Sequence, residues 1–247
     1  AIYGVMGWFI VHQRMPAFII TLAGMLAFRG LHWLVIGSKN ADVKVGSNEN
    51  AMSLLNSWHL PHVAGWVLCG VAAAALGALA WRARARRIAH QLQVPDRDTA
   101  FLTWFIPAQL ILLLVAVMNG YNGIPLPLLL LGVVAIAVHI LTKHTPFGRH
   151  LFAIGGNEDA ARISGVRILP VLVTAFALAG AIVALTGFLQ TAYGGSSTYT
   201  VGKEMELDAI AACVIGGVSL RGGRGSVMGV LFGALLMAAL LNGMMKI

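Results

Sequence analysis

The sequence predicts an all-α protein, a polytopic transmembrane helical bundle with a broken or re-entrant helix near residues 207–220. Composition is the first reason, because 58% of the 247 residues are hydrophobic and only 11% are charged, whereas about a quarter of the residues in a soluble domain are charged. The second reason is a series of apolar runs of about 20 residues, the length that a helix needs to cross a bilayer core of about 30 Å. The third is that the basic residues lie in short loops between these runs, which argues for a membrane and against a nucleic-acid partner.

The apolar runs give the expected membrane spans in order. Runs of the required length occupy residues 16–37, 62–81, 99–118, 126–142, 168–190 and 226–245. Residues 1–11 are interpreted as the end of a further span, so we expect a fragment of a longer protein that lacks both termini. Residues 207–220 are too short to cross the membrane comfortably, which predicts a half-helix, a broken helix or a re-entrant segment.

Loop charges give the expected orientation. If the arginine-rich loop 82–98 is cytoplasmic, the alternation of spans puts the loop 143–167 on the same side, and the loops of that side hold most of the 17 Lys and Arg residues. The loops of the opposite side hold only Lys39, Lys44 and Lys203. The run 81–87 could also bind anionic lipid, but the positively charged flank of a membrane span explains it more simply.

One charged residue lies inside an apolar run. Arg29 is about 20 Å from the cytoplasmic end of the 16–37 span. An unpaired charge is costly at that depth, so we expect Arg29 to face the interior of the bundle. His32 follows on nearly the same face of the helix. The two residues are predicted either to pair with other polar groups or to line a polar path through the bundle.

A polar stretch between two long apolar runs is predicted to form a short helix. Residues 157–164 can make about two turns, with Asn157 as the N-cap. Glu158 and Asp159 then fall in the first turn, where the helix dipole favours anions. Gly165 suits the C′ position, which often requires a left-handed backbone.

Small residues flank and line this expected helix. Gly155 and Gly156 are expected to let the chain turn into it. Ala160 and Ala161 are expected to present small side chains to a groove on a partner. An ordinary capped loop helix is the alternative when the residues are taken without any family resemblance.

The segment 207–220 begins with acidic side chains and ends with glycines. Glu206 and Asp208 either complement the positive end of a helix dipole or take part in gating or in contact with an external partner. Gly216 and Gly217 permit a sharp change of backbone direction. The glycines that recur every four residues after this segment are Gly225, Gly229 and Gly233. This spacing lets the last span pack closely on a neighbour, most simply within the same chain.

Three segments resemble the sugar-permease branch of ABC importers, the group that includes the ribose and xylose permeases. They are MPAFIITLAGMLAFRG at 15–30, TPFGRHLFAIGGNEDAARISG at 145–165 and ELDAIAACVIGGVSLRGGRG at 206–225. The first is similar to the family's P-x-F-I-x-T-L-G pattern, the second to its cytoplasmic coupling loop and the third to its E-L-D-A-I-A-A pattern. The insert from roughly 56 to 98 most resembles that of the longer xylose-type permeases.

The resemblance implies a single transmembrane permease domain over residues 1–247, with a cytoplasmic coupling loop at 143–167. It implies transport of a monosaccharide, xylose or a similar pentose, across the bacterial inner membrane. The residues that it implies for coupling to an ATPase are Gly156, Asn157, Glu158, Asp159, Ala160, Ala161, Arg162 and Gly165. Those that it implies for the translocation pathway or for gating are Arg29, His32, Glu206, Asp208, Gly216 and Gly217.

The resemblance also implies partners. These are ABC ATPase subunits that bind ATP and Mg²⁺, a second permease copy in a dimer, a periplasmic sugar-binding protein and membrane lipid. The chain itself is expected to hold no cofactor, metal or catalytic residue and not to be an enzyme, because the sequence contains no Walker A, HExxH or GxSxG motif.

Two alternatives stay open. The same class of importer could carry another sugar or a sugar-like signal. An ion-driven secondary carrier is weaker, because such a protein should carry acidic residues at mid-membrane. Here only Asp208 comes near that requirement, and it lies close to the end of its segment.

Overall fold

The computed structural model describes residues 2–13, 15–36, 41–42, 54–55, 57–89, 97–198 and 201–244. This part of the chain is nearly all helical, which confirms the predicted fold class. Its contacts divide it into two compact units, one made of Ala1–Ser53 with Leu131–Ile247 and the other of Leu54–Leu130. The single domain expected over residues 1–247 stays a prediction.

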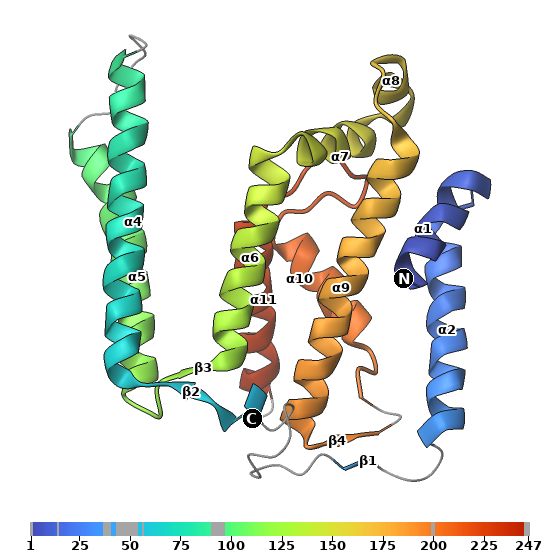
Figure 1. Ribbon diagram of the computed structural model, residues 1–247, viewed down its shortest axis with the longest axis horizontal. Helices are drawn as coiled ribbons and strands as arrows, with labels where there is room; N and C mark the ends of the chain where they lie inside the picture. Colours follow the sequence, from blue (N-terminus) through green and yellow to red (C-terminus); the bar gives the residue numbers. More distant parts are fainter. Residues whose placement is uncertain are drawn as a thin grey trace. The chain divides into compact units, whose positions relative to one another are not determined.

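The smaller unit is a helical hairpin (Figure 1). Its helices, α4 (His62–Ala89) and α5 (Arg97–Asn119), pack against each other. At the end of the hairpin, β2 (His59–Leu60) pairs antiparallel with β3 (Ile124–Pro125). The predicted spans 62–81 and 99–118 both fall within these helices.

The side chains of Cys69, Val115 and Ile124 form the buried core of this hairpin. A hydrogen bond also ties the two helices together, because Nε1 of Trp104 donates to the carbonyl oxygen of Ala73 at 3.0 Å. Apolar packing supplemented by an interhelical hydrogen bond is the usual way in which membrane helices associate.

α4 is longer than its predicted span. It has 28 residues, which corresponds to about 42 Å and exceeds a hydrocarbon core of about 30 Å. The apolar run ends near Trp81, but the helix continues through the arginines to Ala89 because Arg and Ala both favour helix. Arg86 and Arg87 lie in its last turn, where the helix dipole favours positive charge.

The larger unit contains the remaining long helices (Figure 1). In chain order its helices are α1 (Ile2–Gln13), α2 (Ala17–Ile36), α6 (Leu126–His144, which begins in the smaller unit), α7 (Pro146–Gly156), α8 (Glu158–Ile163), α9 (Ile168–Gly194), α10 (Met205–Ile215) and α11 (Val227–Met244). α1 packs along α9 and also contacts α2, and α10 packs along α11. One short strand pair, β1 (Ala41–Asp42) with β4 (Ser196–Ser197), joins the segment after α2 to the end of α9.

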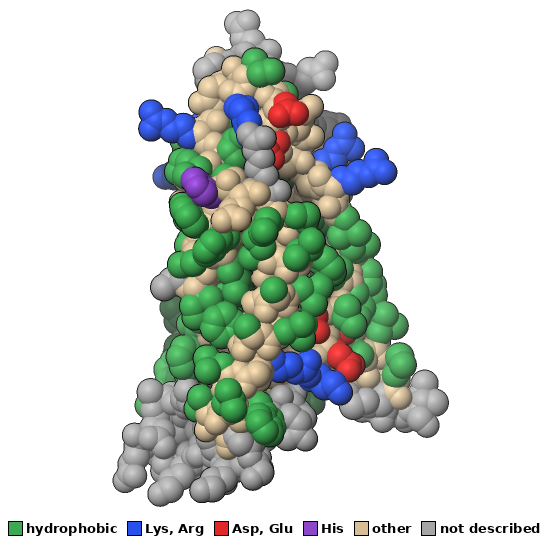
Figure 2. Space-filling view, turned by 90° about the vertical axis from the view of Figure 1, so that its right-hand side faces the viewer, with side chains coloured by type: hydrophobic (Ala, Val, Ile, Leu, Met, Phe, Trp, Pro, Cys, Tyr) green, Lys and Arg blue, Asp and Glu red, His purple; other side chains and the backbone are tan. Residues whose placement is uncertain are grey.

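Five of the described helices are long and apolar enough to cross a membrane, namely α2, α4, α6, α9 and α11. α5 is not among these five, because its described apolar part, Trp104–Asn119, is shorter than they are. Most large hydrophobic side chains on these helices are exposed, as expected for surfaces that face lipid. Figure 2 shows the hydrophobic side chains as a broad band, with Lys and Arg side chains gathered toward its two ends.

α10 is the short helix that the sequence predicted. It has 11 residues, or about 16 Å, roughly half of the membrane core. After Ile215 the chain leaves the helix through Gly216 and Gly217, and Gly217 has a left-handed backbone with φ +80°. The segment is therefore a half-helix that ends before the predicted limit at residue 220.

Candidate functional site

The helix predicted at 157–164 is present as α8, and both of its predicted caps are confirmed. Oδ1 of Asn157 accepts a hydrogen bond from the amide of Ala160 at 3.0 Å. Glu158 and Asp159 lie in the first turn. Gly165 follows the C-cap Ser164 with φ +83°, a conformation that favours glycine over any residue with a Cβ.

The outer surface of α8 carries one ion pair and one exposed apolar side chain. Nη2 of Arg162 lies 3.0 Å from Oε1 of Glu158, one helical turn away. The next residue, Ile163, is 88% exposed. Sequence reasoning missed Ile163 as a site residue. The available signal was a large apolar side chain at the end of an otherwise polar and small-residue helix.

Ala161 forms the base of α8 instead of facing a partner. It is 4% exposed and packs in a cluster with Ile154 of α7 and Ile168 of α9. The expectation that Ala160 and Ala161 both face outward holds for Ala160, which is exposed, and is wrong for Ala161. The reason is geometric, because a helix of six residues must place one side against the elements that flank it.

The acidic end of α8 also borders a cavity. Glu158, Asp159 and Arg162 line a space of about 370 Å³. The other lining residues are Ile10, Val11, Met15 and Leu172, which come from α1, the connection to α2 and α9. The charged side chains of α8 thus lie beside an apolar wall of the same chain.

The segment before α8 is a helix, α7, that the sequence reasoning did not predict. Oγ1 of Thr145 accepts a hydrogen bond from the amide of Gly148 at 3.4 Å, and Pro146 begins the helix. Gly155 and Gly156 were expected to form the turn into α8, but they complete α7. The break lies at Asn157, where φ is −159°. This residue ends one helix and caps the next.

Gly155 lies against the loop that follows α10. A Cβ built on Gly155 would be 2.6 Å from the backbone nitrogen of Gly223. A Cβ on Gly222 would likewise be 2.6 Å from the carbonyl oxygen of Gly155. Gly222 and Gly223 have left-handed backbones, with φ +89° and +72°. The two backbones approach this closely because no side chain separates them.

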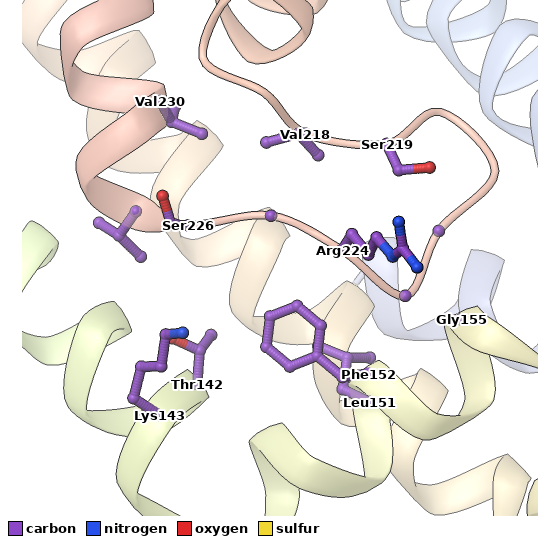
Figure 3. Close-up of a pocket in the computed structure, with 14 residues that line it drawn as sticks. Thr142, Lys143, Leu151, Phe152, Gly155, Val218, Ser219, Arg224, Ser226 and Val230 are labelled. Carbon is purple, nitrogen blue, oxygen red and sulfur yellow. The ribbon is translucent and has the colours of Figure 1, made fainter.

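A second cavity, of about 370 Å³, lies beside this contact. Figure 3 shows Phe152 of α7 facing the loop that carries Val218, Ser219 and Arg224. Ser226 caps α11 from the same loop, and its Oγ accepts a hydrogen bond from the amide of Gly229 at 3.0 Å. α7 therefore contacts the segment that joins α10 to α11.

The recurring glycines pack α11 against α10, as the sequence predicted for packing within the chain. A Cβ on Gly233 would meet the carbonyl oxygen of Ala212, and one on Gly229 would meet that of Gly216. A Cβ on Gly225 would lie 3.2 Å from the side chain of Val218. α10 and α11 are thus held backbone to backbone.

Three of the predicted pathway residues line one cavity of about 260 Å³, although they lie far apart in sequence. Arg29 and His32 come from α2, and Glu206 comes from the first turn of α10. Lys203 also lines this cavity, and sequence reasoning missed it as a site residue. Its ammonium lies 3.7 Å from the carboxylate of Glu204.

The other predicted pathway residues lie elsewhere. Asp208 is exposed on α10 and does not line this cavity. Gly216 and Gly217 lie at the far end of α10, where Gly216 contacts α11. The structure therefore brings Arg29, His32 and Glu206 together and leaves the two glycines about one helix length away.

Several apolar helices of membrane-spanning length, together with a half-helix packed on the last of them, define a multi-pass membrane protein. The chain belongs to the family described as the branched-chain amino acid transport system / permease component, which matches residues 1–247. Membership of this family confirms the resemblance to permeases. The five apolar helices and the similarity to sugar permeases, given below, fit a multi-pass protein of the inner membrane.

Its relatives include sugar permeases. The chain is 42% identical over 240 residues, 96% of its length, to the xylose transport system permease protein XylH of Haemophilus influenzae, covering 62% of that protein. It is 40% identical over 238 residues to XylH of Escherichia coli K12, covering 60% of it. A match of 46% identity to the ribose import permease protein RbsC of Bacillus subtilis spans 51% of this chain and 39% of that one.

The chain thus spans about 60% of the length of the xylose permeases that it matches. No solved structure matches it significantly.

Proposed function

We propose that this chain is the membrane-spanning part of the permease subunit of an ATP-driven monosaccharide importer, with xylose or a similar pentose as the solute. The observation that carries this proposal is an identity of 40–42% to xylose permeases over 96% of the chain. The ribose permease match covers only about half of the chain. The likeness thus extends over more of the chain with these xylose permeases than with this ribose permease, which favours xylose over ribose.

The energy for transport comes from other subunits. In this proposal separate ABC ATPase subunits bind ATP and Mg²⁺, as the resemblance to ABC importers implies. A second permease copy completes the pathway as a dimer, and a periplasmic sugar-binding protein delivers the solute. Membrane lipid surrounds the apolar helices. The chain performs no covalent chemistry in this scheme.

α8 is the proposed contact with the ATPase, and its geometry supports this role. Its end presents the exposed Ile163 beside the pair of Arg162 with Glu158, two kinds of group that a partner surface can recognise. Ala161 fixes α8 to Ile154 and Ile168. A displacement of α8 is therefore passed to α7 and α9 as a rigid movement.

Each predicted coupling residue has a part in this arrangement. Asn157 and Gly165 fix the two ends of α8, and Ala161 anchors its base. Gly156 ends α7 directly before the cap. The exposed residues that contact the ATPase in this proposal are Glu158, Asp159, Ala160 and Arg162, with Ile163 added from the structure.

The proposed translocation pathway uses the cavity of Arg29, His32 and Glu206 at one end of α10. Gly216 and Gly217 provide a bend at its other end and so suit a gate. Asp208 lies between these two regions, on the exposed side of α10.

The test uses the full-length permease, tagged and expressed in its native cell. It is solubilised in mild detergent, co-purified proteins are identified, and uptake of labelled xylose is measured in the same strain. We expect a stoichiometric ABC ATPase that is lost when residues 159–165 are scrambled, together with loss of uptake. A matched control scrambles residues 82–88 at the end of α4, to which this proposal assigns no part in coupling. Intact, inserted permease without any ATPase would move the assignment to an ion-driven carrier.

A further inference from the structure

The cavity of Arg29, His32 and Glu206 has the size of a small-molecule subsite. Its volume is about 260 Å³, just below the range of about 300–1,000 Å³ typical of pockets for drug-sized ligands. α2 forms one wall, and the segment that enters α10 forms the other. The space suits one small polar molecule.

Three charged side chains line the cavity, Arg29, Lys203 and Glu206, and among the described residues the carboxylate of Glu206 pairs with neither cation. Arg29 lies about 10 Å along the helix axis from Ile36, the last residue of α2. Neither Arg29 nor Glu206 forms an ion pair within the part of the chain that the structure describes. Charged groups in a membrane protein normally pair or contact water. Both groups are therefore available to water or to a polar solute.

His32 is held in place at the edge of this cavity. Its Nε2 lies 3.4 Å from Oγ of Ser197. Ser197 belongs to β4, which pairs with β1, so the end of α9 is joined to the segment after α2. α2, which carries Arg29 and His32, is thus joined to β4 before any solute binds. This lowers the entropic cost of ordering the cavity on binding.

The combination of groups selects the chemistry of the ligand. Arg29 and Lys203 only donate hydrogen bonds and a carboxylate accepts them, whereas each sugar hydroxyl does both. A molecule with several hydroxyls can contact the cationic side chains and the carboxylate of Glu206 at once, but a simple cation or anion can pair only with groups of the opposite sign. The ring of Phe28, which also lines the cavity, offers an apolar surface to the C–H groups of a sugar ring.

We propose that this cavity is a monosaccharide-binding subsite of the permease itself, in which the hydroxyls of one sugar bridge Arg29 on α2 and Glu206 at the start of α10. The proposal rests on the sugar-transport function proposed above and adds a site to it. The residue before α10, Glu204, has φ +67°, a sparsely populated conformation for a residue with a Cβ. A solute that bridges α2 and α10 therefore binds beside a strained backbone position at the start of α10.

The test measures xylose binding to full-length permease in lipid nanodiscs, without the ATPase and without a binding protein, by saturation-transfer NMR. We expect Glu206→Gln to weaken xylose binding at least about tenfold, because it removes a charged hydrogen-bond acceptor. Glu158→Gln is the matched control. It makes the same chemical change on α8, at an exposed side chain that does not line this cavity, and should leave the xylose affinity unchanged.

Arg29→Lys provides a second variant that keeps the charge and is expected to weaken binding as well. Circular dichroism and gel filtration verify that each variant folds. Equal xylose affinity in wild type, Glu206→Gln and Arg29→Lys would overturn the subsite, and so would the absence of any xylose signal from wild type. ATPase co-purification and uptake are measured separately, so a failed subsite leaves the transport assignment standing. A failed transport assignment is recognised by the missing ATPase.

Discussion

Gly155 of α7 and Gly223, in the loop between α10 and α11, touch through their backbones. A Cβ on Gly155 would lie 2.6 Å from the nitrogen of Gly223, and one on Gly223 would lie 2.7 Å from Cα of Gly156. Through α7, this contact connects the loop after the half-helix with α8. In the proposed transporter it joins the ATPase contact to the segment that bends at Gly217.

Gly155→Ala is expected to destabilise the protein, because the added Cβ meets backbone that cannot rotate away. Overpacking of this kind costs about 1–3 kcal/mol, and the thermal midpoint should fall by several degrees. The measurement is thermal unfolding of the detergent-solubilised permease, followed by fluorescence-detected gel filtration.

Gly156→Ala is the control for this prediction, because a Cβ on Gly156 would meet nothing within 4 Å. Its midpoint should stay at or slightly above that of wild type, since Ala favours helix more than Gly does. Equal midpoints for Gly155→Ala and Gly156→Ala would mean that the α7–loop contact is not tight in the membrane.

Gly233→Ala is expected to separate α10 from α11. The new methyl would collide with the carbonyl oxygen of Ala212 and lie 2.9 Å from the nitrogen of Gly216. Gly243→Ala makes the same change on the same helix, where a Cβ meets nothing within 4 Å. The yield of monodisperse permease should drop for the first variant only, and a normal yield for both would argue against close packing of these helices.

Short sequence patterns predicted those parts of the candidate site whose structure depends only on neighbouring residues. Asn157 and Gly165 were assigned as the caps of a short helix, and the structure confirms both, because a cap depends on the few residues next to it. α7 escaped prediction because it lacks a long apolar run. Thr145 followed by Pro146 was nevertheless a recognisable helix start.

Contacts between distant segments could not be predicted in the same way. Arg29 and Glu206 were each singled out by their type and position, but only the fold places them in one cavity. The contact of Gly155 with Gly223 likewise depends on how α7 lies against the loop after α10. Ala161 was assigned to the wrong side of α8 because a helix of six residues gives too little sequence to determine its buried face.

Glu158→Gln is expected to change stability very little. The pair with Arg162 joins groups whose side chains are both 54% exposed, and exposed i,i+4 pairs contribute about 0.3–0.5 kcal/mol. The thermal midpoint should therefore fall by no more than about 1–2 °C. A larger fall, measured in the same unfolding assay, would show that the pair is shielded from solvent by a part of the permease outside this chain.

Ile163→Ser should reduce coupling without reducing stability. Ile163 is 88% exposed, so its removal leaves no cavity within the chain, and the thermal midpoint should stay unchanged. In the proposed complex this side chain is buried against the ATPase, and truncation of a well-buried apolar anchor costs about 2 kcal/mol or more. Co-purified ATPase and xylose uptake should therefore both fall at least about tenfold.

Ile163→Leu is the matched control for this last prediction, because it keeps the apolar volume and should retain most of the ATPase and most of the uptake. Ala161→Leu should differ from Ile163→Ser by lowering the thermal midpoint, because it forces a larger side chain between Ile154 and Ile168. If Ile163→Ser kept wild-type uptake and a full complement of ATPase, the partner would have to dock elsewhere on α8. The side containing Glu158 and Asp159 would then become the candidate, because these acids border the cavity beside α1.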